Sequence, residues 1–459
     1  MEENKNRAAA PESEPYMNNS LSKQHNASSL IKFAFPTIVM MLFMALYTMI
    51  AGFFVANFIS ADALAALNIV IPASGILTSL AVWLGAGGSV VISRKMGEGR
   101  DAEARSDNTM LILLVIAIGL VIMVLTQVFA RPVLTLLGAT QELYPLSLQY
   151  YRMTFYFSVP LLLQVLFQYL FVTSGNPRLG LICVVVGGVT DMILEYVFIV
   201  LLDLGLTGAA LATGIGYTIP AVTGLVWFTS CKSNPLRFYK PKFRKTMFRD
   251  SLVNGAANMI MNLSGSVVTL LFNRTIVVYL GETGIAAATI VLYARFLFNS
   301  VLSGYSSGVA PVISFNYGRR DFGQVKSLFR ISIKAVAVQS VGLLATCALL
   351  RNVIAGLFAG GDGSLAAIAA TGILIFSLTY LFNGVNTFTN TLFSALGNGK
   401  ISALMAFLYT FVFLVGAMAI LPGLGLGVNG VWLAAPVAEL CSVIVSAALL
   451  KKYQNVYGY

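Results

Sequence analysis

The sequence is poor in charge and in histidine, and each shortage excludes a class of protein. Only 10% of its 459 residues are charged, whereas soluble domains carry about 25%, and 58% are hydrophobic. The single histidine, His25, lies in a polar N-terminal segment. A histidine-based proton relay, a zinc site and a Ser-His-Asp site in the apolar part of the chain are therefore excluded.

Cysteine is also scarce, and no catalytic motif is present. The four cysteines lie within or at the ends of apolar runs, which is typical of small packing residues rather than of a disulfide framework or a metal site. We therefore expect a protein that is not an enzyme and that needs no metal or cofactor.

Long apolar segments, by contrast, are abundant. In lipid only helices and closed barrels satisfy their own backbone, and these segments far exceed the roughly 10-residue strands of a barrel. Most are longer than the roughly 20 residues that a transmembrane helix needs. The sequence predicts an all-α integral membrane protein with twelve spans, at residues 30–58, 62–95, 105–137, 144–174, 178–202, 206–230, 249–280, 284–316, 323–358, 364–396, 400–421 and 427–450.

The net charge of +11 is concentrated in alternate connections between these spans. The second connection holds Arg94, Lys95, Arg100 and Arg105, whereas the connections on the other side have no Lys or Arg. Because Lys and Arg are enriched in cytoplasmic loops, we expect a multi-pass protein of the inner (plasma) membrane with both termini in the cytoplasm. The distribution favours the lipid bilayer, and not nucleic acid, as the partner of these charges.

The chain divides into two lobes of six spans each, at residues 29–230 and 249–453. Segment 1–28 is predicted to be disordered and cytoplasmic, and 454–459 a cytoplasmic tail. The linker at 231–248 lies in a stretch, CKSNPLRFYKPKFRKTMFR, with seven Lys or Arg. The favoured interpretation is a linker that reinforces topology, and the alternative is an amphipathic element on anionic headgroups.

Strings in the second lobe repeat strings in the first. LAALNIVI at 64–71 matches IAAATIVL at 285–292, and Gly175-Asn176 matches Gly397-Asn398. Each lobe has an even number of spans, so both point the same way, and the repeat is parallel with its pseudo-two-fold axis along the membrane normal. A half-length repeat in an apolar chain indicates a transporter made of two bundles.

Two acids lie deep in the fifth predicted span. Asp191 is almost midway between Arg178 and Asp203, and Glu195 follows at i+4, so both carboxylates share one helix face. Ionisable groups in lipid are functional by default, and two acids this close cannot both stay ionised cheaply. The pair favours proton coupling, and a structural acid bonded to a neighbouring hydroxyl or amide is the alternative.

In the second lobe Glu439 is the only acid deep in a span, and Arg295 is the natural candidate to neutralise it. A fixed Arg–Glu pair and a coupling or cation-binding role fit the sequence equally well. Amide side chains also recur at helical spacing on single faces, which should point to protein or water. Helix–helix hydrogen bonding and a share in a binding site are both open for Gln164, Gln168, Asn258, Asn262, Asn383 and Asn386.

Five strings stand out within about residues 30–450: GAGGSVVISRKMGEGRDAEA (85–104), TSGNPRLG (173–180), GYSSGVAPVISFNYGRRDFGQV (304–325), ALGNGK (395–400) and PVAE (436–439). They resemble strings of the multidrug and toxic compound extrusion (MATE) transporters, especially of their bacterial DinF/MepA-like branch. The resemblance implies a V-shaped carrier with two six-helix lobes that rocks between outward- and inward-facing states.

Members of this family often carry a key acid in the first helix, where this chain has Ala51. In the fifth helix, related sequences commonly show Asn and then Asp-Pro, and this chain shows Asp191 and Glu195-Tyr196. The resemblance thus assigns ion coupling to Asp191 and Glu195.

We therefore expect a secondary active multidrug exporter that works as a monomer. It would antiport organic cations or amphipathic toxins against an inward proton gradient, with sodium as the alternative coupling ion. A flippase for lipid-linked sugars from the same superfamily is the alternative function. A flippase should have a strongly basic central cavity, whereas the deep groups of this chain are mostly acids and amides.

Overall fold

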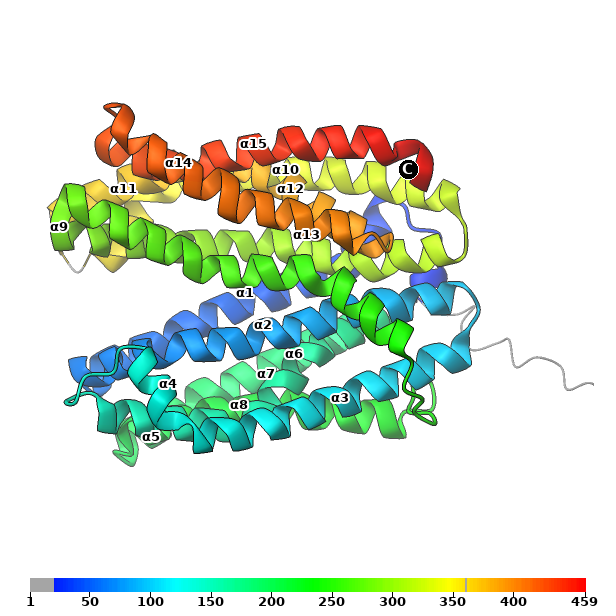
Figure 1. Cartoon of the computed structure of the whole chain (residues 1–459), viewed down its shortest axis with the longest axis horizontal. Coiled ribbons are helices and arrows are strands. Elements are labelled where there is room, and N and C mark those ends of the chain that lie inside the picture. The colour runs from blue at the N-terminus through cyan, green and yellow to red at the C-terminus, as the bar shows by residue number, and fades with distance from the viewer. Residues whose placement is uncertain (1–19, 360) are drawn as a thin grey trace, which may run out of the picture.

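In a computed structural model of the chain, residues 20–359 and 361–459 are described, and every regular element among them is a helix (Figure 1). Within these residues ten helices are long and apolar enough to cross a membrane, and two bent helix pairs raise the number of candidate spans to as many as twelve. The predicted all-α membrane fold is confirmed.

The first lobe is the lower layer of Figure 1 and ends with the last turn of α8. Its third span continues past α3 into a short helix, and its fifth ends in the π-helical turn η2. The elements are α1 (Ala27–Phe58), α2 (Ala61–Gly97), α3 (Asp101–Val128), α4 (Ala130–Leu136), α5 (Tyr144–Tyr156), α6 (Ser158–Thr173), α7 (Pro177–Glu195), η2 (Tyr196–Leu201) and α8 (Gly205–Ser230).

The second lobe is the upper layer of Figure 1. Its first two spans share the label α9 (Lys245–Gly318), but non-helical backbone at Gly281 separates them at the predicted boundary. The other elements are α10 (Phe322–Phe358), α11 (Gly363–Ser377), α12 (Tyr380–Ala395), α13 (Gly399–Phe407), the π-helical turn η3 (Leu408–Leu414), α14 (Val415–Ile420), η4 (Pro422–Leu424) and α15 (Gly427–Tyr457).

The irregular parts of the two lobes repeat as well as their sequences do. The fourth span of each lobe is a bent helix pair, with 54° between α5 and α6 and 50° between α11 and α12. The fifth span of each lobe contains a π-helical turn. The matched residues Gly175 and Gly397 have φ values of 83° and 81°, which only glycine adopts freely. The two lobes therefore match in the places where their helices bend or end, as well as in the order of the helices.

The lobes meet through α1 and α2 on one side and α9 on the other, towards the end that holds the C-terminus and the last turn of α2, which contains Arg94. We call this the basic end. Here Trp83 Nε1 donates to Leu252 O (2.6 Å) and Ser314 Oγ donates to Val90 O (2.8 Å). Among the described residues, all hydrogen bonds between α2 and α9 lie between Ser79 and this end of α2.

The N-terminal segment differs from its prediction. Residues 1–19 lie outside the described part, but residues 20–28, which we predicted to be disordered, are ordered. The side chain of Leu21 is fully buried, and Ser20 Oγ donates to Gly175 O (2.7 Å) in the first lobe. From the second lobe, Arg319 Nη1 donates to Ser22 O (3.2 Å) and Gln324 Nε2 to His25 O (3.2 Å). The segment thus binds both lobes at the basic end, and α1 begins at Ala27.

Candidate functional site

Two buried acids form the chemical centre of the first lobe. Asp191 and Glu195 lie one turn apart on α7 and are only 3% and 2% exposed. α7 changes to the π-helical turn η2 directly after Glu195. Such turns often occur at functional sites, because the wider helix alters the direction of neighbouring side chains. The one-face arrangement predicted from the spacing is present.

A cavity of about 190 Å³ adjoins Asp191. The predicted amide Gln164 lines it from α6, and Tyr47 lines it from α1. Its other walls are mostly glycine and proline, from α7 and α8, which leaves room beside the carboxylate. Tyr47 precedes Ala51 by one turn, so α1 supplies a phenol where an acid was expected from the resemblance.

The acids have oxygens that no protein donor reaches. Asp191 Oδ1, Glu195 Oε2 and Gln164 Oε1 are buried without a hydrogen-bond partner among the described residues. Within the same part of the chain, no Lys or Arg forms an ion pair with either acid. Buried polar groups are normally satisfied, so this oxygen-rich cluster is suited to a proton or a small cation.

Sequence analysis missed the hydroxyl groups around these acids. Thr213 of α8 lies close enough to Asp191 for a polar interaction, and Tyr47 lies equally close to Gln164. Tyr150 and Tyr217 lie within electrostatic range of both acids. Only the fold could identify these partners, because tyrosines are common throughout the chain and the partners come from α1, α5 and α8.

A second polar cluster surrounds Glu439 on α15, which is 1% exposed. Two predicted amides of α12 hold its carboxylate: Asn383 Nδ2 donates to Oε1 and Asn386 Nδ2 to Oε2, both at 2.6 Å. Ser446 Oγ in turn donates to Asn386 Oδ1 (2.8 Å) and fixes the amide. The structure therefore brings together three residues that the sequence left separate.

Arg295 belongs to this cluster without forming a close ion pair with Glu439. Among the ion pairs of the described residues, none joins Arg295 to Glu439. Both side chains interact with the hydroxyl of Tyr409, a residue of η3 that the sequence did not point to. The charge of Arg295 also acts directly on Glu439, so Arg295, Tyr409 and Glu439 form one interacting cluster. The fixed pair and the coupling role considered from the sequence both stay predictions.

The remaining predicted amides lie elsewhere. Asn258 lines a cavity of about 280 Å³ between the lobes, together with serines of α2, α9 and α12. Asn262 Oδ1 accepts from Ser79 Oγ across the interface (2.8 Å). Gln168 is buried on α6, but its Nε2 has no partner among the described residues and it does not line the cavity beside Asp191. These three amides are separate from the two acid clusters in this state.

Comparisons with known proteins agree with this architecture. The MatE family model matches residues 36–197 and 256–418, one match in each lobe. The chain is 23% identical over 429 residues to the multidrug export protein MepA of Staphylococcus aureus (strain NCTC 8325 / PS 47), with 93% of each chain covered. It is 21% identical over 431 residues to MepA of Staphylococcus saprophyticus, covering 92% of this chain and 93% of that protein.

Solved structures show the same fold. A crystal structure of MATE in complex with MaL6 superposes with a TM-score of 0.91 at 19% identity, covering 97% of this chain and 99% of the other. An outward-facing MATE family transporter of the MOP superfamily gives a TM-score of 0.89 at 19% identity, covering 98% and 99%.

Proposed function

Because the chain belongs to the MatE family, we propose that it is a secondary active multidrug exporter driven by an inward proton gradient. One observation carries the coupling mechanism: Asp191 and Glu195 are buried on one helix face, with unpartnered oxygens and no basic partner among the described residues. An ionised acid pair is costly in a desolvated site of this kind. The pair therefore releases its proton only when another cation takes the proton's place. Organic cations and amphipathic toxins are the substrate class that could replace a proton there.

The size of the cavity indicates the order of events. The enclosed space has room for about one water molecule, far less than the roughly 300–1,000 Å³ pockets that hold drug-sized ligands. In this state it accommodates a proton or a small ion beside Asp191. Substrate binding would require α1, α7 and α8 to separate, after which the phenols of Tyr47 and Tyr217 could face a cation. Proton and drug would then exclude each other, as antiport requires.

We further propose that the basic end faces the cytoplasm, following the enrichment of Lys and Arg in cytoplasmic loops. The lobe contacts at that end then close the cytoplasmic side, and the state is outward-facing. Both acids lie within one chain, which supports a monomer as the functional unit. Glu439 would supply a second acidic point in the other lobe, held by Asn383 and Asn386.

The proposal is tested in proteoliposomes that are given a proton gradient without sodium. Export of a cationic dye and proton movement are measured for the wild type, Asp191→Asn, Glu195→Gln and the double variant. We expect the single variants to lose most transport and the double variant to lose it entirely. The control is Asp203→Asn, an exposed acid close beyond the same span, which should transport normally.

Wild-type transport by the double variant would refute the assignment of the acids. Transport that needs sodium and ignores the proton gradient would replace the proposed coupling ion. The alternative function, flipping of lipid-linked sugars, is less consistent with the site, because neither described cavity is lined by Lys or Arg that could bind a pyrophosphate.

A further inference from the structure

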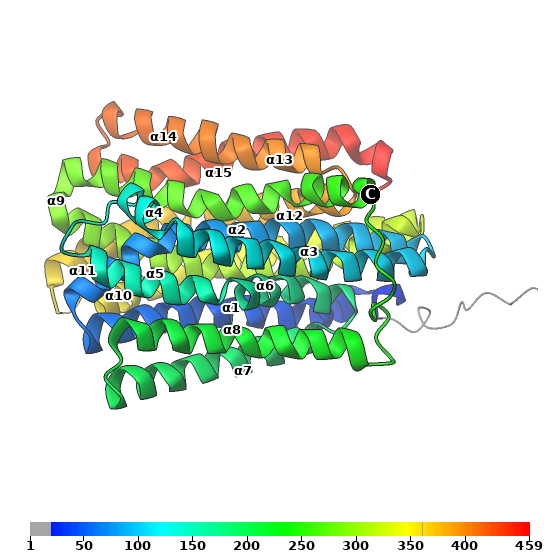
Figure 2. The ribbon, with the colours of Figure 1, turned by 60° about the horizontal axis from the view of Figure 1, so that its bottom comes forward.

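A basic strap, residues 231–244, connects the lobes at the basic end, where Figure 2 shows it running from α8 to α9. The segment from 231 to 249 contains seven Lys or Arg and no Asp or Glu. The strap contains turns but no regular helix. The strap is therefore not an amphipathic helix lying on a membrane. Its position depends on contacts with the rest of the protein.

Side chains of α3 hold the strap along a single path. Asn108 Nδ2 donates to Leu236 O (2.9 Å), and Arg105 Nε donates to Pro235 O (3.0 Å). Further along, the backbone N–H of Tyr239 donates to Thr109 Oγ1 (3.0 Å), and that of Lys242 to Ser106 Oγ (3.0 Å). These bonds use the strap's backbone, and the side chains of Lys240 and Lys242 stay exposed.

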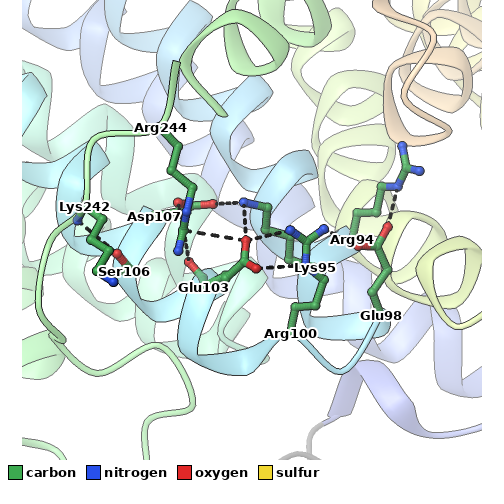
Figure 3. A network of polar contacts seen from close by, with 9 residues as sticks. All are labelled: Arg94, Lys95, Glu98, Arg100, Glu103, Ser106, Asp107, Lys242 and Arg244. Atoms are coloured by element: carbon green, nitrogen blue, oxygen red, sulfur yellow. Dashed lines mark hydrogen bonds and ion pairs between the residues drawn. The ribbon is translucent and has the colours of Figure 1, made fainter. Parts of the chain in front are cut away.

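A buried acid fixes the end of the strap (Figure 3). Asp107, which is 1% exposed, accepts from Arg244 Nη1 at 2.8 Å and also pairs with Lys95 of α2. Arg244 is thereby neutralised inside the protein. The other basic residues of the strap are exposed and form no ion pair among the described residues; they are Lys232, Arg237, Lys240 and Lys242.

The depth of the strap is set by α3. Residues 101–109 of this helix are mostly polar (DAEARSDNT), and its apolar stretch begins at Met110, with Leu113 43% exposed. At a rise of about 1.5 Å per residue, the attachment points at 105–109 lie within about two turns of the lipid-facing surface. Two aromatic residues of the strap are also exposed at this level, Tyr239 (49%) and Phe243 (63%). Aromatic side chains of this kind favour the membrane–water interface.

We propose that the basic strap is a binding site for the headgroups of anionic phospholipids. Its lysines can contact the phosphate of a lipid while Tyr239 and Phe243 contact the upper acyl chains. The pinned backbone keeps these groups in place, so little ordering cost is added on binding. A soluble anion would use the lysines but not the aromatic residues.

The experiment uses the full chain in detergent. Short-chain phosphatidylglycerol and phosphatidylcholine are titrated, and bound lipid is counted by native mass spectrometry. Wild type should retain phosphatidylglycerol in preference to phosphatidylcholine, and the preference should weaken at high salt. Because each lysine near an anionic surface contributes about fivefold, Lys240→Gln with Lys242→Gln should weaken phosphatidylglycerol binding by at least tenfold. Phe243→Ser should weaken both lipids.

The matched control is Lys326→Gln with Lys452→Gln, which removes two exposed lysines of the second lobe and should leave binding unchanged. Equal affinity for the two lipids, or an equal loss in the control, would overturn the proposal. So would inorganic phosphate that displaces the lipid at comparable concentration, because the site would then belong to a soluble anion. No outcome depends on transport, so the test stands apart from the proposed function.

Discussion

Gly87 of α2 and Gly255 of α9 face each other across the lobe interface with no room for a side chain. A Cβ on Gly87 would lie 1.8 Å from Ser251 O, and a Cβ on Gly255 would lie 1.9 Å from Trp83 O. These neighbours are backbone atoms, so no rotamer change can relieve the overlap. Both glycines are on the basic-end side of Ser79, where the lobes are closed.

We predict that Gly87→Ala and Gly255→Ala each force the lobes apart at the basic end and reduce export. Spin labels introduced through Arg178→Cys and Lys326→Cys, in a background without the native cysteines, report the distance between the lobes. In both variants the mean distance should increase and the distribution of distances should broaden. Gly75→Ala and Gly265→Ala are matched controls on the same two helices, where a Cβ meets nothing within 4 Å. Wild-type distances in the first two variants would contradict the prediction.

Asp107 should be a major contributor to stability. Its carboxylate is 1% exposed and pairs with Lys95, whose side chain is only 11% exposed. Asp107→Asn removes the buried counter-charge of both Lys95 and Arg244 and leaves Lys95 with only the more exposed Glu103 (3.3 Å), which we expect to cost up to about 3 kcal/mol. Glu98→Gln is the control, because Glu98 pairs with half-exposed arginines and such surface pairs contribute about 1 kcal/mol or less. Thermal unfolding in detergent should show a much larger decrease in unfolding temperature for Asp107→Asn than for Glu98→Gln.

The fold could be predicted because lipid restricts a chain strongly. Apolar length fixed the spans, and the even number per lobe fixed the parallel repeat. Even the matched glycines marked real features, since Gly175 and Gly397 adopt the same left-handed backbone. The sequence also identified Asp191, Glu195 and Glu439, because carboxylates are rare in apolar runs and all three are buried.

What surrounds these acids was not predictable from spacing. Periodicity assigns a residue to a face of its own helix but does not say which helix lies opposite. Thr213 and Tyr409 were therefore missed, although each interacts with a buried acid. The order of residues 20–28 was missed for a similar reason, because the polar segment is held by hydrogen bonds from distant residues such as Arg319.

His25 should make the packing of the N-terminal segment sensitive to pH. Burial lowers the pKa of His25 below its usual 6.5, and the charge of Lys23 adds to the effect. The neutral ring lies 2.9 Å from Ser20 O through Nε2. Because the folded pKa is the lower one, packing of the segment is fully stabilised above pH 6.5 and weakens as the pH falls below it. The protection of residues 20–26 from hydrogen exchange, calculated against the intrinsic rate at each pH, should therefore decrease between pH 7 and pH 5.

The control for His25 is His25→Gln, whose amide can still donate to Ser20 O but does not titrate. Its exchange should show no extra pH dependence. If the wild type and His25→Gln respond identically to acid, His25 is not the group responsible.

The phenol of Tyr409 should couple Arg295 to Glu439 energetically. Glu439→Gln removes a charge and Arg295→Met removes the other, so each variant should lower the free energy of unfolding. Because the two groups share one hydroxyl, the double variant should lose less free energy of unfolding than the two single variants lose together. The difference should be about 1 kcal/mol or more. Repeating the cycle in a Tyr409→Phe background should abolish most of this difference. Unfolding in detergent, followed by tryptophan fluorescence, gives the four free energies of each cycle.

The matched cycle pairs Glu439→Gln with Arg274→Met, because Arg274 is an exposed arginine on the span that precedes that of Arg295. Those two changes should add. Additivity in the Arg295 cycle as well would mean that the arginine and the acid are independent. Coupling that survives in the Tyr409→Phe background would mean instead that charge acts directly between them, without the phenol. Only coupling that needs the hydroxyl supports a relay, in which a change at Glu439 reaches Arg295 through Tyr409.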